Sequence, residues 1–307
     1  MKKIATLVAA MCVGSLFAKE KLVIQVADPD GNPVSHAMVK VKTMNKIIVF
    51  GSDRAADFDT YSVTTDEKGR AELRFDCVTR CFSWGATADG YYDGSWKDDE
   101  FEGSETFSRV GKVLISFKEH EKELKTTLWP KKNPQPMHVR WLRPALQLPV
   151  EQGRYGFDLK EGDWVAPLGR GLVADVFYVH EGESQCIEMP DGGYVERMAD
   201  GCSPSAVYCV NTNREFVTKI QLRKKMDGVV PVSIAIDADE CLVIRTRVTK
   251  DEVGNVIKAN YAEIRGQMVL DNELRFRQII YNPRQNDLNL EWDNTTNLSK
   301  PRRVSLN

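Results

Sequence analysis

Alternation of apolar and polar residues is the feature that most constrains the fold of this chain. It appears first in Leu22–Val41, LVIQVADPDGNPVSHAMVKV, where two alternating runs flank a turn rich in Asp, Gly, Asn and Pro. A second turn and strand follow in Thr64–Phe75, TTDEKGRAELRF. Alternation with period two buries one face of a β-strand, whereas a helix needs apolar residues three or four positions apart. The pattern therefore predicts an all-β fold.

The same pattern runs through the rest of the chain. Further alternating segments, rich in Thr, Val and aromatic residues, are KVLISFK, LKTTLW, LVADVFYV, FVTKIQL, CLVIRTRV and LRFRQIIY. Turn residues separate them, as in Thr65–Arg70, Ala88–Ser95 and Met226–Pro231. Short strands with turns at this spacing favour antiparallel sheets packed as a sandwich.

Composition and charge define the class of protein. The 307 residues are enough for about two domains of ordinary size. A content of 42% apolar and 28% charged residues is typical of a globular protein. The formal charge is −2, and the basic clusters Lys131–Pro134 and Arg223–Lys225 are short. Because nucleic-acid binders concentrate Lys and Arg on one face, we expect no nucleic-acid partner.

Residues 1–18 are predicted to be a secretory signal peptide. Lys2 and Lys3 precede the uncharged, mostly apolar run Ile4–Phe17, and the small residue Ala18 follows. A basic start, a short apolar run and a small residue are the three parts of such a leader. Since spanning a bilayer takes about 20 apolar residues, the run predicts a leader that is removed, not a membrane anchor.

Two cleavage positions are compatible with this leader. Cleavage after Ala18 leaves the large Leu16 at the third position back, so cleavage after Ser15 competes with it. A lipoprotein signal would need a small residue before Cys12, where Met11 stands. The sequence thus predicts a bacterial protein exported to the periplasm or beyond, soluble once processed and without a transmembrane anchor.

Proline content marks a domain boundary. The prolines of residues 129–149 are Pro130, Pro134, Pro136, Pro144 and Pro149. Proline lacks the N–H donor and keeps the preceding residue extended, so the segment reads as a stiff connector in which Met137–Leu142 can form an edge strand. We therefore predict a β-sandwich domain over 19–128, the connector, and a mostly-β domain over 150–307.

Six cysteines remain after removal of the leader. They are Cys77, Cys81, Cys186, Cys202, Cys209 and Cys241. An even number in an exported chain predicts disulfides. Cys77 and Cys81 flank a short loop between two predicted strands and lie within disulfide reach, whereas the other four allow three pairings. Their spacing does not resemble a zinc site, which usually shows Cys-x2-Cys or His-x3-His pairs, so we predict no metal.

A family resemblance supports the first domain. The strand VIQVAD, the segments DGNPVSHAMVKV and TTDEKGRAELRF, and the closing ATADGYY resemble carboxypeptidase-regulatory-like and bacterial immunoglobulin-like modules. The resemblance covers Leu22 to about Phe117 and implies a transthyretin-like or immunoglobulin-like sandwich of about seven strands without catalytic activity. The insertion Asn45–Tyr61 departs from the compact pattern. The C-terminal half resembles exported bacterial proteins of no known activity.

Aromatic residues in predicted loops are the candidate binding residues. Trp164 lies in GDWVAPLGRG, the most distinctive segment of the second half, where it either stacks on a sugar or peptide or closes the end of the β core. Tyr91 and Tyr92 lie near one end of the first domain, together with Trp84 and Trp96. Loops at the ends of sandwiches often bind ligands, although core packing explains Trp84 better.

Three acidic segments are candidate cation sites. Asp28, Asp30 and Asn32 alternate as at the start of a calcium loop, but Pro33 stands where such a loop needs Gly, so a hairpin turn is favoured. The others are Asp98, Asp99, Glu100 and Glu102, and Asp237, Asp239 and Glu240. A solvated charge run is the ordinary interpretation, and we predict no cofactor.

No catalytic motif is present in the sequence. It contains neither a Gly-x-Ser-x-Gly elbow nor a His-Glu-x-x-His helix. A pair of Cys241 or Cys209 with His180 or His138 would form only in space. We therefore predict a non-enzymatic binding or structural protein of the bacterial envelope or extracellular space, with an envelope glycan or protein as partner. The alternative is a secreted hydrolase acting on glycan or peptide.

Overall fold

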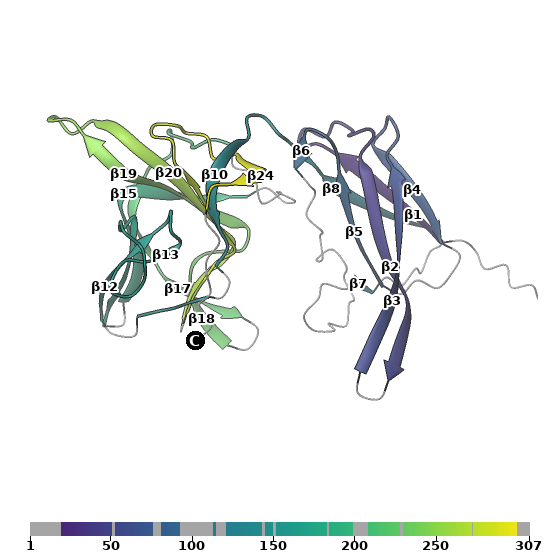
Figure 1. Cartoon of the computed structure of the whole chain (residues 1–307), viewed down its shortest axis with the longest axis horizontal. Coiled ribbons are helices and arrows are strands. Elements are labelled where there is room, and N and C mark those ends of the chain that lie inside the picture. Colours follow the sequence, from purple (N-terminus) through teal and green to yellow (C-terminus); the bar gives the residue numbers. More distant parts are fainter. Residues whose placement is uncertain are drawn as a thin grey trace, which may run out of the picture. The chain divides into compact units, whose positions relative to one another are not determined.

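Every regular element of the described chain is a β-strand, which confirms the predicted all-β class. The computed structural model describes residues 20–50, 53–75, 81–92, 113–114, 121–142, 145–149, 152–182, 184–198, 208–227, 230–271 and 273–299. The chain divides into two compact units, one ending at Leu128 and the other beginning at Trp129, and the short segment Gly90–Tyr92 belongs to the second unit. Figure 1 shows both units.

The first unit contains two sheets. Its strands are β1 (Glu20–Ala27), β2 (Met38–Phe50), β3 (Asp53–Thr64), β4 (Arg70–Phe75), β5 (Cys81–Thr87), β7 (Val113–Leu114) and β8 (Glu121–Thr127). One sheet has the order β4-β1-β8, in which β1 is antiparallel to β4 and parallel to β8. The other has the order β3-β2-β5-β7. Both sheets contribute fully buried side chains, among them Leu22 and Ile24 from β1 and Val39 and Val41 from β2.

Three turns share one chemical device. Asp28 accepts hydrogen bonds from the backbone N–H groups of Asp30 and Asn32 at 3.0 and 2.8 Å. Asp66 and Asp251 form the same pattern with the amides two and four residues later. Such a carboxylate replaces a backbone acceptor and fixes the turn. The Asp28 segment is therefore a turn, but not the hairpin that was predicted, because β1 and β2, which it joins, belong to different sheets.

The second unit is larger. Its strands are β6 (Tyr91–Tyr92), β9 (Trp129–Pro130), β10 (Gln135–Arg140), β11 (Leu146–Gln147), β12 (Gly153–Asp158), β13 (Asp163–Trp164), β14 (Val176–Glu181), β15 (Ser184–Arg197), β16 (Val217–Gln221), β17 (Arg223–Asp227), β18 (Val230–Ile236), β19 (Glu240–Lys250), β20 (Val256–Arg265), β21 (Met268–Leu270), β22 (Glu273–Arg275), β23 (Gln278–Asn282) and β24 (Trp292–Asn297). A curled ten-stranded sheet follows the order β13-β12-β14-β15-β19-β20-β23-β10-β24, with β16 paired to β15. A five-stranded sheet has the order β11-β22-β21-β18-β17.

The main core of the second unit lies between these two sheets. The large sheet contributes alternate residues such as Leu242 and Ile244 from β19 and Ile279 from β23, all fully buried. The smaller sheet contributes Met268 and Leu274. The period-two alternation of the sequence thus places one face of each strand in this core.

The proline-rich segment 129–149 forms strands of the second unit instead of a separate connector. It contributes β9, β10 and β11, and β10 lies between β23 and β24, not at an edge. The pairing of β10 with β24 shifts register between Gln135 and Met137, so Pro136 occupies the irregularity. A proline in a sheet is tolerated at such a position because no ladder hydrogen bond needs its missing N–H.

A second core covers the opposite face of the large sheet. It contains Tyr194, Cys241, Val243 and Leu290. The strand β15 pairs with β14 and β16 in its first half and with β19 from Gly193 onward. A Cβ atom on Gly193 would lie 2.7 Å from the carbonyl oxygen of Val243, so only glycine allows the two strands to approach here.

We predict that Gly193→Ala destabilises the second unit by about 1–3 kcal/mol, because the added methyl group forces β15 away from β19. Gly254→Ala is the matched control, since a Cβ atom there meets no atom within 4 Å and only the positive φ opposes it, at about 1 kcal/mol. Urea unfolding of both variants measures the difference. Equal losses would show that the contact with Val243 does not limit the pairing.

Candidate functional site

A cluster of charged side chains lies at one end of the main core of the second unit. We call Asp158, Asp175, Thr246 and Arg247 the aspartate–arginine cluster. Arg247 donates from Nη2 to Asp158 Oδ1 at 2.9 Å and to Asp175 Oδ2 at 3.0 Å, and from Nε to Asp175 Oδ1 at 2.9 Å. The hydroxyl of Thr246 donates to Asp175 Oδ1 at 2.7 Å. The cluster therefore joins segments up to 89 residues apart.

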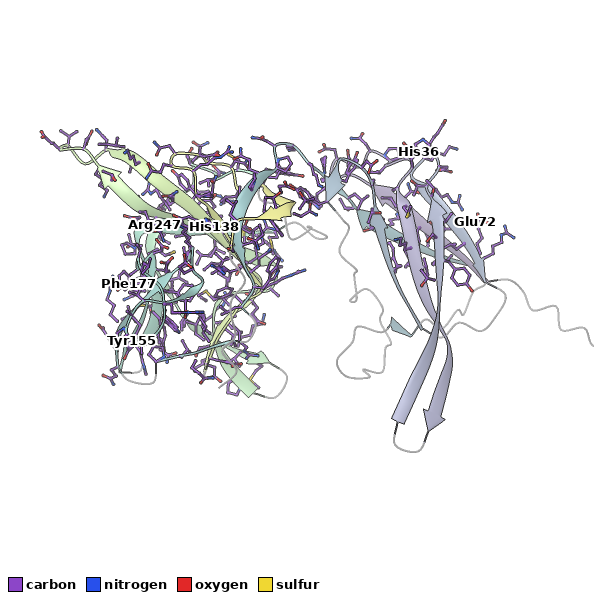
Figure 2. The ribbon with its side chains drawn as sticks, in the orientation of Figure 1. His36, Glu72, His138, Tyr155, Phe177 and Arg247 are labelled. Atoms are coloured by element: carbon purple, nitrogen blue, oxygen red, sulfur yellow. The ribbon has the colours of Figure 1, made fainter. Side chains whose placement is uncertain are left out.

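The backbone of β19 places Arg247 in this cluster. The pairing of β19 with β20 is irregular between Thr246 and Thr249, and Arg247 has a φ of 53°. A left-handed residue at a bulge redirects its side chain. The guanidinium lies 5.0 Å from the ring centre of Tyr281, within the range of a cation–π contact. His138, labelled with Arg247 in Figure 2, contacts the same Tyr281 ring.

The two aspartates hold the loop between β12 and β14. Asp158 accepts hydrogen bonds from the backbone N–H groups of Lys160, Glu161, Leu172 and Val173 at 2.9 to 3.1 Å. Asp175 accepts one from the N–H of Leu159 at 2.9 Å. Both ends of the loop are thus bonded to carboxylates that also accept hydrogen bonds from Arg247. We call residues 159–174 the braced loop.

Further contacts fix the centre of the braced loop. Asp163 accepts hydrogen bonds from the backbone N–H groups of Trp164 and Arg170. A Cβ atom on Gly169 would lie 2.3 Å from the carbonyl oxygen of Trp164, so glycine is required for this close approach. The glycines and aspartates that made this segment distinctive in sequence therefore serve its conformation.

Electrostatics keep Arg247 charged. Burial by itself disfavours its cationic form, but the hydrogen bonds and charge of Asp175 and the charge of Asp158 outweigh this and raise its pKa. Both carboxylates are nearly fully buried and accept several donors. A guanidinium that never loses its proton, paired with carboxylates whose oxygens are occupied, stabilises structure and offers no proton to transfer.

The braced loop exposes apolar side chains. Leu172 is 82% exposed, Leu168 51% and Val173 43%. Asp158 accepts hydrogen bonds from the backbone amides of two of these residues, Leu172 and Val173. Grouped apolar exposure on an ordered loop is typical of an interaction surface.

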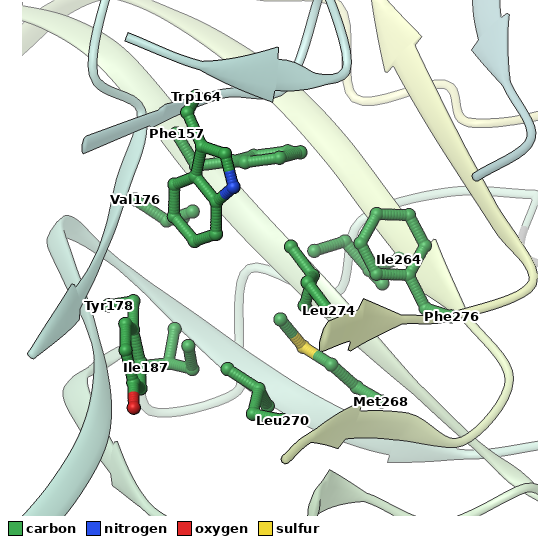
Figure 3. Close-up of a pocket in the computed structure, with 10 residues that line it drawn as sticks. All are labelled: Phe157, Trp164, Val176, Tyr178, Ile187, Ile264, Met268, Leu270, Leu274 and Phe276. Carbon is green, nitrogen blue, oxygen red and sulfur yellow. The ribbon is translucent and has the colours of Figure 1, made fainter. Parts of the chain in front are cut away.

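Trp164, the first predicted binding residue, is a core residue. It is 4% exposed, its Nε1 donates to the carbonyl oxygen of Gln147 at 3.0 Å, and its ring packs edge-to-face against Phe157 at 5.3 Å. Figure 3 shows it at an apolar cavity of about 10 Å³ that Met268 and Leu274 line from the other sheet. Such a space is near the minimum for one water molecule, so Trp164 closes the core.

Tyr92 is also buried, at 1% exposure, and Tyr91 is partly buried. The hydroxyl of Tyr92 donates to Glu291 Oε1 at 2.9 Å. Glu291 also accepts the backbone N–H groups of Lys132 and Asn133. Burial, followed by the hydrogen bond and charge of Glu291, raises the pKa of Tyr92. Tyr92 is therefore a structural anchor of the second unit without an exposed ring face for a ligand.

The cysteines that the structure describes are free. Cys186 and Cys241 are buried and Cys209 is exposed. Cys186 lies opposite Val179, and Cys241 lies opposite Glu196 and Arg265, so neither has a cysteine as cross-strand neighbour. The predicted disulfides are thus not formed by these three. Cys77, Cys202 and the side chain of Cys81 lie outside the described residues.

The predicted acidic segments are neutralised by protein groups or lie outside the described residues. Asp237 pairs with Arg223 and Lys225, which lowers its pKa. Asp239 pairs with Arg197, and Glu240 accepts the backbone N–H of Asp237. Asn32 donates to Asp28 and lowers its pKa. The remaining predicted residues Trp96, Asp98, Asp99, Glu100 and Glu102 fall outside the described ranges.

Neither histidine is a cross-strand neighbour of the predicted cysteines, since Cys241 lies opposite Glu196 and Arg265 and Cys209 lies opposite Asn289. His138 lies on β10 opposite Tyr281, and His180 lies on β14 opposite Gln185. Cys241 lies beside Glu263, and burial followed by the charge of Glu263 raises its pKa. A thiol with a raised pKa is a poor nucleophile.

Trp84 is 4% exposed, as expected for a core residue.

A second buried charge pair was missed by the sequence analysis. Arg265 donates from Nη2 to Glu263 Oε2 at 2.8 Å, and both residues are at most 1% exposed. They lie two residues apart on β20 and therefore on one face of the strand. In sequence, alternating charged residues indicate a solvated face, and only the opposite signs at this spacing hint at a pair.

Comparisons with known proteins assign neither a family nor a function to this chain. No protein family and no curated protein matches the chain. Among solved structures, the chain is similar to a "putative membrane-associated protein of unknown function" from Bacteroides fragilis NCTC 9343. The two sequences are 10% identical, the alignment covers 87% of this chain and 98% of that one, and the TM-score is 0.20. A likeness at that level carries no conclusion about this chain.

Within the described ranges, the structure contains no helix of the length and apolarity that a membrane span requires.

We predict that His138 makes stability depend on pH. Burial, followed by the charges of Lys160, Arg140 and Arg247 and opposed by Glu161, lowers its pKa. The unfolded chain, with a histidine pKa of about 6.5, then binds the proton more readily than the folded chain. Stability is therefore full above this pKa and declines as the pH falls.

His138→Gln should reduce the loss of melting temperature between about pH 7.5 and pH 5.5 by a few degrees. The wild-type chain provides the reference loss. Thermal unfolding followed by circular dichroism at both pH values gives the comparison. An unchanged pH dependence in His138→Gln would contradict the assignment.

Proposed function

We propose that this chain is an exported, non-enzymatic binding or structural protein of the bacterial envelope, and that its second unit contacts an envelope protein through the braced loop. The observation that carries the proposal is the aspartate–arginine cluster. Asp158 and Asp175 accept hydrogen bonds from Arg247 and from backbone amides of the loop. This buried polar cluster thus holds a loop in place.

A rigid loop suits binding. Ordering a loop on association costs free energy, and a loop already held in its bound conformation avoids that cost. The exposed Leu168, Leu172 and Val173 then meet a partner in a defined arrangement. The geometry of the described residues gives the hydrolase alternative no specific support.

The side chains favour a protein over a glycan as partner. Sugars are bound by exposed aromatic faces together with polar groups, whereas Trp164 and Tyr92 are buried. Aliphatic side chains exposed on an ordered loop match the apolar centre of a protein interface. Trp141, 48% exposed, is an aromatic residue that a glycan could use, and the experiment below separates the two partners.

For the first unit we propose an immunoglobulin-like or carboxypeptidase-regulatory-like sandwich. Seven described strands in two sheets agree with such a module in number. The buried residues of β1, β2 and β5 agree with a core shared by two sheets. Modules of this kind position other domains and bind through loops, which fits a role without catalysis.

Export is tested by expressing the full chain in a Gram-negative bacterium and separating cytosol, periplasm and medium. We expect the protein outside the cytosol, with its N-terminus at Lys19 or Leu16, because the apolar run of the leader directs secretion and a small residue permits cleavage. Mass spectrometry of the purified protein identifies the terminus. Recovery of cytosolic protein that retains Met1 would overturn the proposal of export.

Binding is tested by sedimenting the purified protein with isolated envelopes. The variant Leu168→Ser/Leu172→Ser should bind about tenfold more weakly, because it removes the apolar contacts. Asp158→Asn should also weaken binding, since it releases the loop without altering its exposed apolar side chains. Val253→Ser is the matched control, because Val253 is also 82% exposed, at the turn between β19 and β20.

Three outcomes decide the matter. Loss of binding in Leu168→Ser/Leu172→Ser with retention in Val253→Ser supports the proposal. Prior protease treatment of the envelopes should abolish binding to a protein partner, and binding that persists would identify a glycan or lipid instead. Equal binding by Leu168→Ser/Leu172→Ser and the wild type would exclude the loop as the contact. Unfolding curves for Asp158→Asn establish that the variant is folded.

A further inference from the structure

The hairpin of β2 and β3 continues beyond the sheet to which it belongs. The two strands pair from Met38↔Thr64 to Phe50↔Asp53. Among the described residues, β5 pairs with β2 only from Met38 to Thr43. From Met44 onward β2 therefore has, within the described ranges, a strand on one side alone. Figure 1 shows the hairpin reaching past the other strands of the first unit.

A bulge separates this extension from the sheet. The register shifts between Met44↔Phe58 and Lys46↔Asp57, so Asn45 is the extra residue. Bulges bend and twist a strand pair away from its sheet. We call residues 46–50 with residues 53–57 the arm. A two-stranded ribbon of this kind is marginally stable on its own, so an additional strand would stabilise it.

The two edges of the arm differ in composition. The β3 edge has Asp53, Arg54 and Asp57 in a run of five residues, whereas the β2 edge reads Lys-Ile-Ile-Val-Phe. Charged residues are the usual protection of an edge strand against pairing with another chain. One edge of the arm thus carries charges at both ends, whereas the other has a single charge, Lys46, followed by four apolar residues of high β-propensity, Ile47–Phe50.

We propose that the β2 edge of the arm pairs antiparallel with the same edge of a second copy of this chain, giving a four-stranded sheet of β3, β2, β2 and β3. The proposal is independent of the braced loop, which belongs to the other unit. An edge can pair with itself about a two-fold axis because antiparallel ladders are symmetric.

Charge favours a second copy as the occupant. A two-fold axis at Ile48 places Ile47 opposite Val49 and Lys46 opposite Phe50, so the two lysines lie at opposite ends of the junction. The charged β3 edges then form both borders of the four-stranded sheet. Since those borders resist further strand addition, the assembly closes as a dimer and does not grow into a fibre.

The first test measures the mass of the processed full chain by sedimentation equilibrium over a range of micromolar concentrations. We expect a monomer–dimer equilibrium. Ile48→Lys places two like charges opposite each other and should raise the dissociation constant at least about tenfold. Ala55→Lys is the matched control, because Ala55 pairs with Ile48 on the protected strand. It should leave the dimer intact.

A second test does not depend on tolerance of a charge. Ile48→Cys should form an intermolecular disulfide under mild oxidation, because the axis places the two cysteines opposite each other within bonding distance. Ala55→Cys, one strand further from the axis, should not. A wild-type chain that stays monomeric, a dimer unaffected by Ile48→Lys, equal cross-linking of both cysteine variants, or growth beyond the dimer would each overturn the proposal.

Discussion

The second unit depends on the pairing of Arg247 with two buried aspartates. Removing Arg247 would leave Asp158 and Asp175, exposed by 1% and 2%, without a compensating charge, and an uncompensated buried charge costs several kcal/mol. A hydrophobic replacement of the whole cluster could be as stable, so its value lies elsewhere. The carboxylates direct backbone amides that no apolar side chain could hold, and the conformation of the braced loop follows from this.

The two buried charge pairs of this unit show how position decides role. Arg247 is bonded through Nε and Nη2 to carboxylates that also bind a loop. Arg265 is bonded to Glu263 through Nη2, whereas its Nε and Nη1 have no hydrogen-bond partner among the described residues. The first pair lies where the chain leaves the sheet, and the second lies within the strand β20. Only the first can determine the course of a surface segment.

Local sequence predicted the strands and turns because their causes are local. Alternation identifies strands, and Asp28 fixes its turn through residues at most four positions away. The candidate site was beyond such reasoning. Asp175 and Arg247 are 72 residues apart in sequence and meet only because β14, β15 and β19 are neighbours in one sheet. Trp164 illustrates the same limit, because its segment was correctly singled out while its ring serves the core.

The two proposed contact surfaces differ in whether their backbone N–H and C=O groups have hydrogen-bond partners. In the braced loop, backbone amides that would otherwise face water are bonded to Asp158, which leaves aliphatic side chains as the exposed feature. In the arm, the backbone groups on the outer side of β2 have no strand beside them in the described part of the chain, and residues 47–50 are apolar. A loop with satisfied amides favours contact through side chains, whereas an open edge favours contact through the backbone. The two surfaces therefore suit different partners, an envelope protein for the loop and an identical strand for the arm.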